Sequence, residues 1–394
     1  MTTADLWAEA APLAGQLAET LAGAGVLRSS EWDRAIRSVP RHLFVPNYVE
    51  QRPDGTWRTV SGDDLDTHSE WLAAVYSDRP LTTALRIDSS GQPVAISSSS
   101  KPGLMVRMLE ALELDDDHRV LEIGTGTGYN AGLLACRLGD GQVASVDIEP
   151  DLVEAAAGRL ALLGMAPRVV ATDGATGLPG AAPFDRIIAT CSVSSIPMAW
   201  VGQLSSRGRI LTDLKITGAA GNLVDLRSVS GGQLEGRFLP KWAGFMPLRS
   251  QVESASMVDR LPQTEERLTT TPSANPWWDH QVVWFLAALT LPSGITTGVR
   301  LDPNTMTPTA TTMQAADGSW VEVTLGADDG GHREVCGSSG DLWSAVENAY
   351  ELWRELGEPG WDAFGLTVSG IDQRVWFDAP TSQHIWALSP GGNG

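Results

Sequence analysis

The stretch VLEIGTGTGYNAGLLA, residues 120–135, places Gly124, Gly126 and Gly128 between an apolar run and an amphipathic segment. The apolar run predicts a short buried strand, and the amphipathic segment after the glycines predicts a helix. Glycine suits the turn between them because the backbone must bend tightly and let a ligand approach it. Dinucleotide sites and purely structural turns share this glycine spacing, so the neighbouring residues have to decide the ligand.

Segments typical of strands and helices alternate on both sides of this turn. Amphipathic helices are predicted at 103–114 and 150–164, and the glycine turn opens a third one. Strands are predicted at 141–148, 167–174, 184–193 and 208–214, in addition to the one before the glycines. This alternation predicts an α/β fold, a doubly wound and Rossmann-like parallel sheet with helices on both faces.

Three acidic residues lie where the predicted strands end. Glu122 stands two residues before the first glycine, where a carboxylate would repel a pyrophosphate but suit the amine of an amino acid. Asp147 ends the next strand, where an acidic side chain can bind ribose hydroxyls. Asp173 ends the third strand and can accept a hydrogen bond from an adenine amino group. A plain surface carboxylate is the alternative interpretation of each acid.

This set of glycines and acids resembles the S-adenosylmethionine (SAM) pocket of class I methyltransferases more than an NAD or FAD site. The resemblance implies SAM as the cofactor and S-adenosylhomocysteine as the product. The residues that we expect to form the pocket lie at or beside the strand ends: Glu122, Gly124, Thr125, Gly126, Thr127, Gly128, Asp147, Ile148, Asp173, Gly174 and Thr190.

Composition narrows the possible partners. The 394 residues carry a formal net charge of −20, which argues against nucleic acid and anionic membranes as partners. The three cysteines are far apart and have no CxxC spacing, so neither a disulfide framework nor a metal site is predicted. The first residues lack the pattern of a signal peptide and no apolar run reaches membrane-spanning length, so we expect a cytoplasmic protein.

Five strings in the same order resemble protein-L-isoaspartate O-methyltransferases, over roughly residues 30–250. They are VPRHLFVP (39–46), VYSDRPL (75–81), the glycine stretch, TDGATGLPGAAPFDRIIAT (172–190) and GFMPL (244–248). The resemblance implies methyl transfer from SAM to the carboxylate of an isoaspartyl residue. The next backbone nitrogen then attacks the ester and forms a succinimide.

The run ISSSSKPGLM, residues 96–105, matches a family pattern in which a serine stands two residues before a helix-opening proline. By this resemblance Ser100 contacts the substrate, with Ser97, Ser98 and Ser99 as further candidates. Capping of the helix that begins at Pro102 is the alternative role of Ser100. The residues expected to bind the substrate are Asp78, Arg79 and Lys101, and Asp78 is also a candidate for ordering the substrate loop; a solvated surface pair is the alternative for Asp78 and Arg79. His42 also lies in a family string, and we interpret it as a structural hydrogen-bonding residue.

We expect four regions along the chain. They are N-terminal helices with an irregular substrate-loop region (1–100, irregular over 41–100), a SAM-binding core (101–250), a polar linker (251–275) and a tryptophan-rich α+β domain for substrate recognition (276–394). Most of the tail's tryptophans can equally belong to its core.

The tail and the serine run together resemble methyltransferases of graspetide (ATP-grasp) and lanthipeptide clusters. This implies an aspartate in an already cyclised precursor peptide as the substrate, an ester that closes to aspartimide or opens to isoaspartate, and possible partnership with the cyclising peptide ligase. Two alternatives remain open: general isoaspartate repair, and a non-catalytic protein that binds SAM or peptide.

Overall fold

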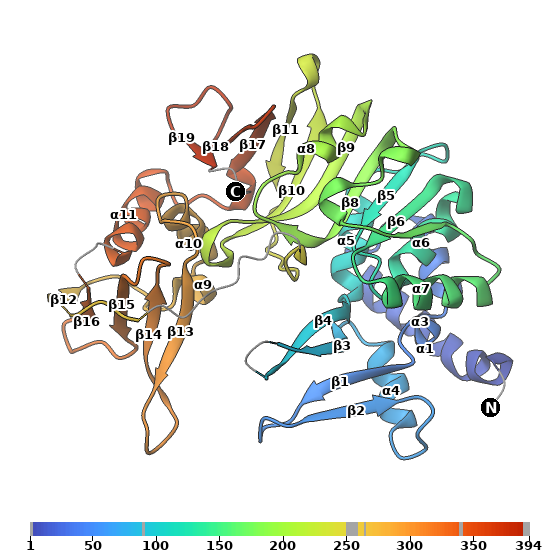
Figure 1. Cartoon of the computed structure of the whole chain (residues 1–394), viewed down its shortest axis with the longest axis horizontal. Coiled ribbons are helices and arrows are strands. Elements are labelled where there is room, and N and C mark those ends of the chain that lie inside the picture. Colours follow the sequence, from blue (N-terminus) through green and yellow to red (C-terminus); the bar gives the residue numbers. More distant parts are fainter. Residues whose placement is uncertain (1–2, 89–90, 250–258, 264, 339–341, 389–394) are drawn as a thin grey trace. The chain divides into compact units, whose positions relative to one another are not determined.

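The computed structural model describes residues 3–88, 91–249, 259–263, 265–338 and 342–388. The chain forms two compact units, which are treated separately below. The first comprises Met1–Thr190 with Ala199–Leu211, and the second comprises Cys191–Met198 with Thr212–Gly394. Figure 1 shows the elements of both units in sequence colours.

The first unit contains the α/β sheet that the sequence predicts. Its strands are β5 (Val120–Ile123), β6 (Val143–Asp147), β7 (Arg168–Ala171), β8 (Phe184–Val193) and β9 (Leu204–Lys215), and their order is β9-β8-β5-β6-β7. The pairs β5–β6, β5–β8 and β6–β7 are parallel. The helices between the strands are α5 (Pro102–Ala111), α6 (Tyr129–Leu138), α7 (Pro150–Leu162) and α8 (Met198–Gly202). Every residue of β5 and β6 is buried, which explains their nearly unbroken apolar sequences.

The N-terminal part of this unit is more regular than its composition suggests. Its helices are α1 (Thr3–Gly23), α2 (Ser30–Ser38), α3 (Arg41–Phe44) and α4 (His68–Val75). Between and after them run β1 (Asn47–Gln51), β2 (Trp57–Ser61), β3 (Leu81–Ile87) and β4 (Pro93–Ser99), which form an antiparallel sheet of order β2-β1-β3-β4.

The prediction that residues 41–100 are irregular is therefore wrong. Part of the Gly, Pro and Asp content sits in a hairpin turn, where Arg52 N donates to Thr56 O and Gly55 has a φ of +84°. The strands themselves contain polar residues at alternate positions, and pairing with neighbouring strands supplies their backbone hydrogen bonds. Neither the turn nor the strand pairing can be inferred from composition alone.

The second unit contains two groups of antiparallel strands. One is a five-stranded sheet of order β12-β16-β15-β14-β13, from β12 (Glu265–Thr269), β13 (Thr296–Leu301), β14 (Pro308–Gln314), β15 (Trp320–Thr324) and β16 (Arg333–Gly337). The other has the order β19-β18-β17-β11-β10, from β10 (Gly221–Ser228), β11 (Leu234–Phe238), β17 (Phe364–Ser369), β18 (Asp372–Phe377) and β19 (Ile385–Leu388). Its helices are α9 (Pro276–Asp279), α10 (Gln281–Ala288) and α11 (Leu342–Glu355). Short 3-10 helices in the two units are Asp140–Gln142, Gly174–Thr176, Pro179–Ala181, Thr217–Ala219, Ser230–Gly232 and Trp361–Ala363.

These units differ from the expected regions. The division falls inside β8 and β9, not at residue 250, and the last strands of the tail extend the group that starts with β10 and β11. The reason is the edge of β11, which pairs with β17 from Leu234↔Val368 to Arg237↔Gly365. The expected linker also contributes β12, while 250–258 and 264 lie outside the described residues.

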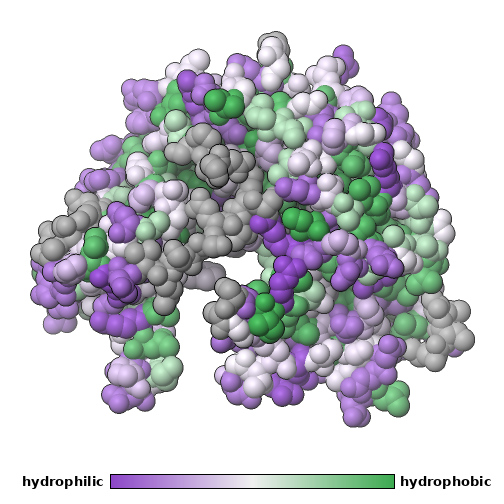
Figure 2. All heavy atoms as spheres, viewed as in Figure 1, coloured by the Kyte–Doolittle hydropathy of each residue, from purple (hydrophilic) through white to green (hydrophobic). Residues whose placement is uncertain are grey.

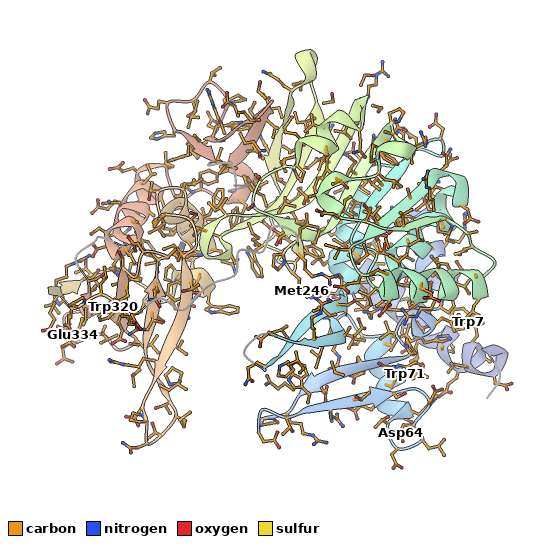
Figure 3. The ribbon with its side chains drawn as sticks, viewed as in Figure 1. Trp7, Asp64, Trp71, Met246, Trp320 and Glu334 are labelled. Carbon is orange, nitrogen blue, oxygen red and sulfur yellow. The ribbon has the colours of Figure 1, made fainter. Side chains whose placement is uncertain are left out.

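Tryptophans of the tail are mostly structural. Trp284, Trp320, Trp343, Trp361 and Trp376 are buried, which confirms the core interpretation for these five. Trp320 and Glu334 lie in the five-stranded sheet, as Figure 3 shows. Trp278, in contrast, is 69% exposed. Figure 2 shows hydrophobic and hydrophilic side chains interspersed on the visible face.

The described residues contain neither a membrane-spanning helix nor a metal-binding cluster. No helix among them is both long and apolar enough to cross a membrane. Nor do three His, Cys, Asp or Glu side chains among them gather as metal ligands would.

Candidate cofactor and substrate site

The glycine turn folds back onto β6. Gly124 N and Thr125 N donate to Val146 O at 2.8 and 3.1 Å. Gly124, Gly126 and Gly128 have φ of +94°, +52° and +89°, the region that L side chains disfavour. A Cβ on Gly124 would lie 2.6 Å from Thr190 Oγ1. The sequence therefore needs glycine here for both conformation and space.

Glu122 lies under this turn and is completely buried. Its Oε1 accepts from Asn130 Nδ2 at 2.7 Å and its Oε2 from Ser145 Oγ at 2.5 Å. Ser145 Oγ is in turn 2.6 Å from Thr125 Oγ1. Burial raises the pKa of Glu122 to about 7. The surface-carboxylate interpretation is wrong for this residue, and these contacts brace the turn; a contact with the SAM amine stays a prediction.

Asp147 and Asp173 are held by backbone groups at the neighbouring strand ends. Asp147 is 7% exposed; its Oδ2 accepts from Gly126 N at 2.9 Å and its Oδ1 from Glu149 N at 3.1 Å. Asp173 Oδ1 accepts from Ala175 N at 2.9 Å. Both carboxylates are thus oriented before any ligand arrives.

The remaining expected pocket residues lie at the same edge of the sheet. Thr190 Oγ1 donates to Gly124 O at 2.7 Å, Thr127 Oγ1 accepts weakly from Tyr129 N at 3.5 Å, and Gly174 O accepts from Trp200 Nε1 at 2.8 Å. Ile148 is 38% exposed directly after β6. The carboxyl ends of β5, β6 and β7 therefore bring the predicted residues together, as expected for a doubly wound sheet.

These residues fit SAM. A Cβ on Gly126 would meet only Ser97 Oγ at 3.7 Å and Ser98 O at 3.8 Å, so the turn leaves space that a side chain would fill. Asp147 is anchored beside this space and suits ribose hydroxyls, because a carboxylate accepts hydrogen bonds from both. The preformed turn and acid need little rearrangement to receive such a ligand.

The serine run forms the end of β4 and lies against Gly126. Ser97 and Ser99 are buried; Thr83 Oγ1 donates to Ser97 Oγ at 3.1 Å, and Arg41 Nη2 donates to Ser99 Oγ at 3.0 Å. Ser98 and Ser100 are partly exposed, and within the described part of the chain no hydrogen bond engages their hydroxyls. Strand alternation explains why Ser98 differs from Ser97 and Ser99, while Ser100 follows the end of β4.

Capping of α5 by Ser100 is wrong. The N-cap of α5 is Lys101, with no side-chain cap, and Pro102 opens the helix. The cap role falls instead to Asp78, whose Oδ1 accepts from Gly103 N at 2.6 Å and whose Oδ2 lies 3.4 Å from Lys101 Nζ. Asp78 thus joins Ser77 to the start of α5, while its role in ordering a substrate loop and the contacts of Asp78 and Lys101 with substrate stay predictions.

Arg79 points to a different neighbour. Its Nη2 donates to Tyr48 OH at 3.0 Å, and its guanidinium lies 5.4 Å from the Tyr48 ring centroid. His42 Nδ1 lies 2.8 Å from Tyr76 OH, and burial lowers its pKa to about 4, so the ring is neutral at pH 7. The structural interpretation of His42 is confirmed.

Arg41 is not among the residues that the sequence patterns single out for the site. Its side chain is completely buried and reaches the end of the serine run. The only sequence signal for a role of Arg41 was its position in VPRHLFVP. Sequence alone does not show that an arginine beside an apolar stretch is buried.

The sheet order, the glycine turn and the acids at the strand ends define a class I methyltransferase. A solved protein-L-isoaspartate O-methyltransferase has this fold, with a TM-score of 0.52 and 22% identity, covering 93% of this chain and all of the other.

Sequence comparison defines the family. The family model for protein-L-isoaspartate(D-aspartate) O-methyltransferase matches residues 67–241. A relative of that name from Azorhizobium caulinodans is 39% identical over 226 residues, 55% of this chain and 86% of the relative. One from Methylorubrum extorquens is 35% identical over 50% of this chain and 71% of the relative, and one from Methanoculleus marisnigri is 35% identical over 45% and 66%. The chain belongs to the protein-L-isoaspartate O-methyltransferase family, and is thereby a SAM-dependent methyltransferase.

Proposed function

We propose that this chain methylates the free carboxylate of an aspartyl or isoaspartyl residue in a peptide, which is the β-carboxylate of the first and the α-carboxylate of the second. The observation that carries the proposal is the contact of the serine strand with the glycine turn, where Ser97 Oγ and Ser98 O lie within 4 Å of a Cβ built on Gly126. An acceptor held by this strand lies beside the cofactor pocket. Relatives named protein-L-isoaspartate O-methyltransferase support the choice of acceptor.

The reaction needs alignment more than acid–base chemistry. SAM supplies an electrophilic methyl group, which passes to a carboxylate oxygen while the carbon–sulfur bond breaks and S-adenosylhomocysteine leaves. The acceptor carboxylate is already ionised at pH 7, so the chain need not remove a proton. Its contribution is to hold the carboxylate in line and to exclude water.

Ser98 and Ser100 are the side chains best placed to hold this carboxylate. Their hydroxyls are partly exposed and have no hydrogen-bond partner in the described chain, whereas those of Ser97 and Ser99 are engaged by Thr83 and Arg41. A hydroxyl that donates to an ionised oxygen forms one of the stronger hydrogen bonds in proteins.

For the acceptor we propose a precursor peptide that a peptide ligase has already cyclised, with the ester closing to aspartimide or opening to isoaspartate. The support is the length of chain beyond residue 241, where the family model ends, and the buried side chains that it adds to the second unit. Trp278, 69% exposed, offers a large rigid contact surface for such a peptide. The cyclising ligase is a possible partner in the same pathway.

General isoaspartate repair is the second candidate, and the names of the relatives favour it. The two candidates differ in the acceptor. A short linear isoaspartyl peptide and a cyclised aspartyl peptide, each incubated with SAM and followed by mass shift, separate them. Preference for the linear peptide supports repair, and methylation of neither supports a non-catalytic binding protein.

Serine variants test the site itself. Ser98→Ala and Ser100→Ala should each lower turnover about tenfold or more, the equivalent of about 1.4 kcal/mol, and leave S-adenosylhomocysteine affinity unchanged. The control is Ser38→Ala on α2, whose hydroxyl donates to Arg34 O on the same helix. Trp278→Ala in the full chain tests the peptide contact, because removal of 276–394 would also remove β17–β19. Wild-type turnover of both serine variants would remove the serines from the mechanism.

A further inference from the structure

We infer that Arg41 is a positioning residue, which sets the end of the serine strand against the cofactor turn. The inference rests on the proposed function, because it assigns the geometry of that site to a residue that touches neither ligand. Its observations are the hydrogen bonds of one buried guanidinium to two separate segments.

Arg41 lies at the start of α3 and its side chain is completely buried. Nη1 donates to Val75 O at 2.5 Å and, weakly, to Ser77 O at 3.3 Å. Nη2 donates to Ser99 Oγ at 3.0 Å and Ser100 O at 3.1 Å, with Ser99 O at 3.5 Å. One planar group therefore ties the end of α4 to the end of β4.

Asp78 makes a second connection between the chain that follows α4 and the chain that follows the serines. The chain from Ser77 continues into Asp78, which accepts from Gly103 N and faces Lys101. Ser100 and Lys101 lie between β4 and α5, and Lys101 O accepts the first helix bonds from Leu104 N and Met105 N at 3.0 and 3.1 Å. Arg41, at Ser100 O, and Asp78, at Lys101 Nζ and Gly103 N, add restraints on either side of this junction.

Arg41 also reaches the helix that the glycine turn opens. Its guanidinium carbon lies 5.8 Å from the centroid of the Tyr129 ring, and Tyr129 is the first residue of α6. An arginine over an aromatic ring is attracted to its face. A shift of Arg41 would thus alter the serine strand relative to the cofactor turn.

The electrostatics of Arg41 do not suit a role in stability alone. The hydrogen-bond acceptors named above are backbone carbonyls and one hydroxyl, and none is a carboxylate. Burial lowers the pKa of the guanidinium to about 10, and it is still a cation at pH 7. Asp78 attracts the guanidinium at longer range, but no carboxylate among the described residues pairs with it directly, so burial of this charge costs free energy that an apolar side chain would not. An arginine provides what an apolar side chain would not, a rigid planar group that donates hydrogen bonds to two segments at once.

The first test uses Arg41→Lys in the full chain, with kcat and KM for the methylated peptide and S-adenosylhomocysteine affinity by calorimetry. Lysine keeps the charge but its single ammonium cannot span both segments. We expect kcat to fall about tenfold or more, with S-adenosylhomocysteine affinity within about twofold of wild type. Arg209→Lys is the matched control: Arg209 is also buried and donates to Ala111 O, away from the serines, and it should keep wild-type kcat.

A second readout does not depend on activity. Hydrogen exchange followed by mass spectrometry should show faster exchange over residues 99–104 in Arg41→Lys than in wild type, and no change there in Arg209→Lys. Ser99→Ala removes one acceptor, and its effect on kcat should be less than additive with that of Arg41→Lys. Circular dichroism of each variant gives the folded fraction by which kcat is normalised.

The outcomes separate the two hypotheses. A folded Arg41→Lys protein with wild-type kcat and wild-type exchange over 99–104 overturns the positioning role. The positioning role is also overturned if kcat of Arg41→Lys equals that of wild type after division by the folded fraction and exchange over 99–104 is unchanged. A wild-type protein that methylates no aspartyl or isoaspartyl peptide overturns the proposed function, while the exchange measurement still decides whether Arg41 orders the segment.

Discussion

Replacement of Glu122 by glutamine should make the first unit more stable at neutral and alkaline pH. Glu122 is completely buried beneath the glycine turn, between Asn130 Nδ2 and Ser145 Oγ. Burial raises its pKa from 4.5 to about 7, because desolvation of the charge outweighs the two hydrogen bonds. Glutamine has nearly the same shape and carries no charge; its oxygen can still accept from Asn130 Nδ2, and its amide can donate to Ser145 Oγ while that hydroxyl donates to Thr125 Oγ1.

The sign and size follow from proton linkage. The folded chain holds the Glu122 proton more tightly than the unfolded chain, so between pH 4.5 and about 7 the folded state binds more protons. Stability from this group is therefore complete below pH 4.5 and is lost as the pH rises to about 7. At about 1.4 kcal/mol per pH unit, the interval corresponds to about 3 kcal/mol, which Glu122→Gln should recover.

The assay is urea denaturation followed by circular dichroism at pH 5, 6, 7 and 8, for wild type, Glu122→Gln and the exposed control Glu154→Gln. The free energy of unfolding of Glu122→Gln minus that of wild type should grow by about 2–3 kcal/mol from pH 5 to pH 8. Asp213, whose pKa burial raises to about 6, contributes to both proteins alike and cancels in this difference. Parallel pH profiles for the two proteins would refute the reasoning, as would an equal gain in Glu154→Gln.

Three further predictions concern the turn and its neighbours. Gly128→Ala should lower the free energy of unfolding, followed by thermal denaturation, by about 1–3 kcal/mol more than Gly139→Ala does. Both glycines have φ above +80°, but a Cβ at position 128 would lie 2.8 Å from Ala156 Cβ, whereas a Cβ at position 139 would lie in open space. Equal costs would contradict the clash. Asp147→Asn should weaken S-adenosylhomocysteine binding about tenfold in calorimetry, since a charged acceptor for the ribose is lost, and wild-type affinity would contradict that role. Asp78→Asn should lower kcat less than about threefold, because the asparagine oxygen can still accept from Gly103 N. Asp78→Ala, which removes this acceptor, should lower kcat several times more. Equal effects of the two variants would show that the charge of Asp78 is what matters.

Much of the site was predictable because its signals are local. A parallel strand end and a turn that needs positive φ are adjacent at Gly124 and Gly126, and the acid that ends the next strand, Asp147, follows only one helix later. The place of β4 was not predictable in this way. Its serines have weak strand preference, and only the pairing Leu81↔Ser99 to Ile87↔Pro93 shows that they form a strand.

The sequence by itself determined the class of fold, the family and the strand ends that carry the acids. Apolar periodicity and glycine conformation operate over one or two elements, so they leave a readable pattern along the chain. Only the tertiary structure decided that Arg41 is buried under the serine run and that β17 pairs with β11. It also decided that the described residues leave the hydroxyls of Ser98 and Ser100 without a hydrogen-bond partner, unlike those of Ser97 and Ser99. These facts depend on contacts between residues 14 to more than 100 positions apart, for which the sequence gives no spacing to read.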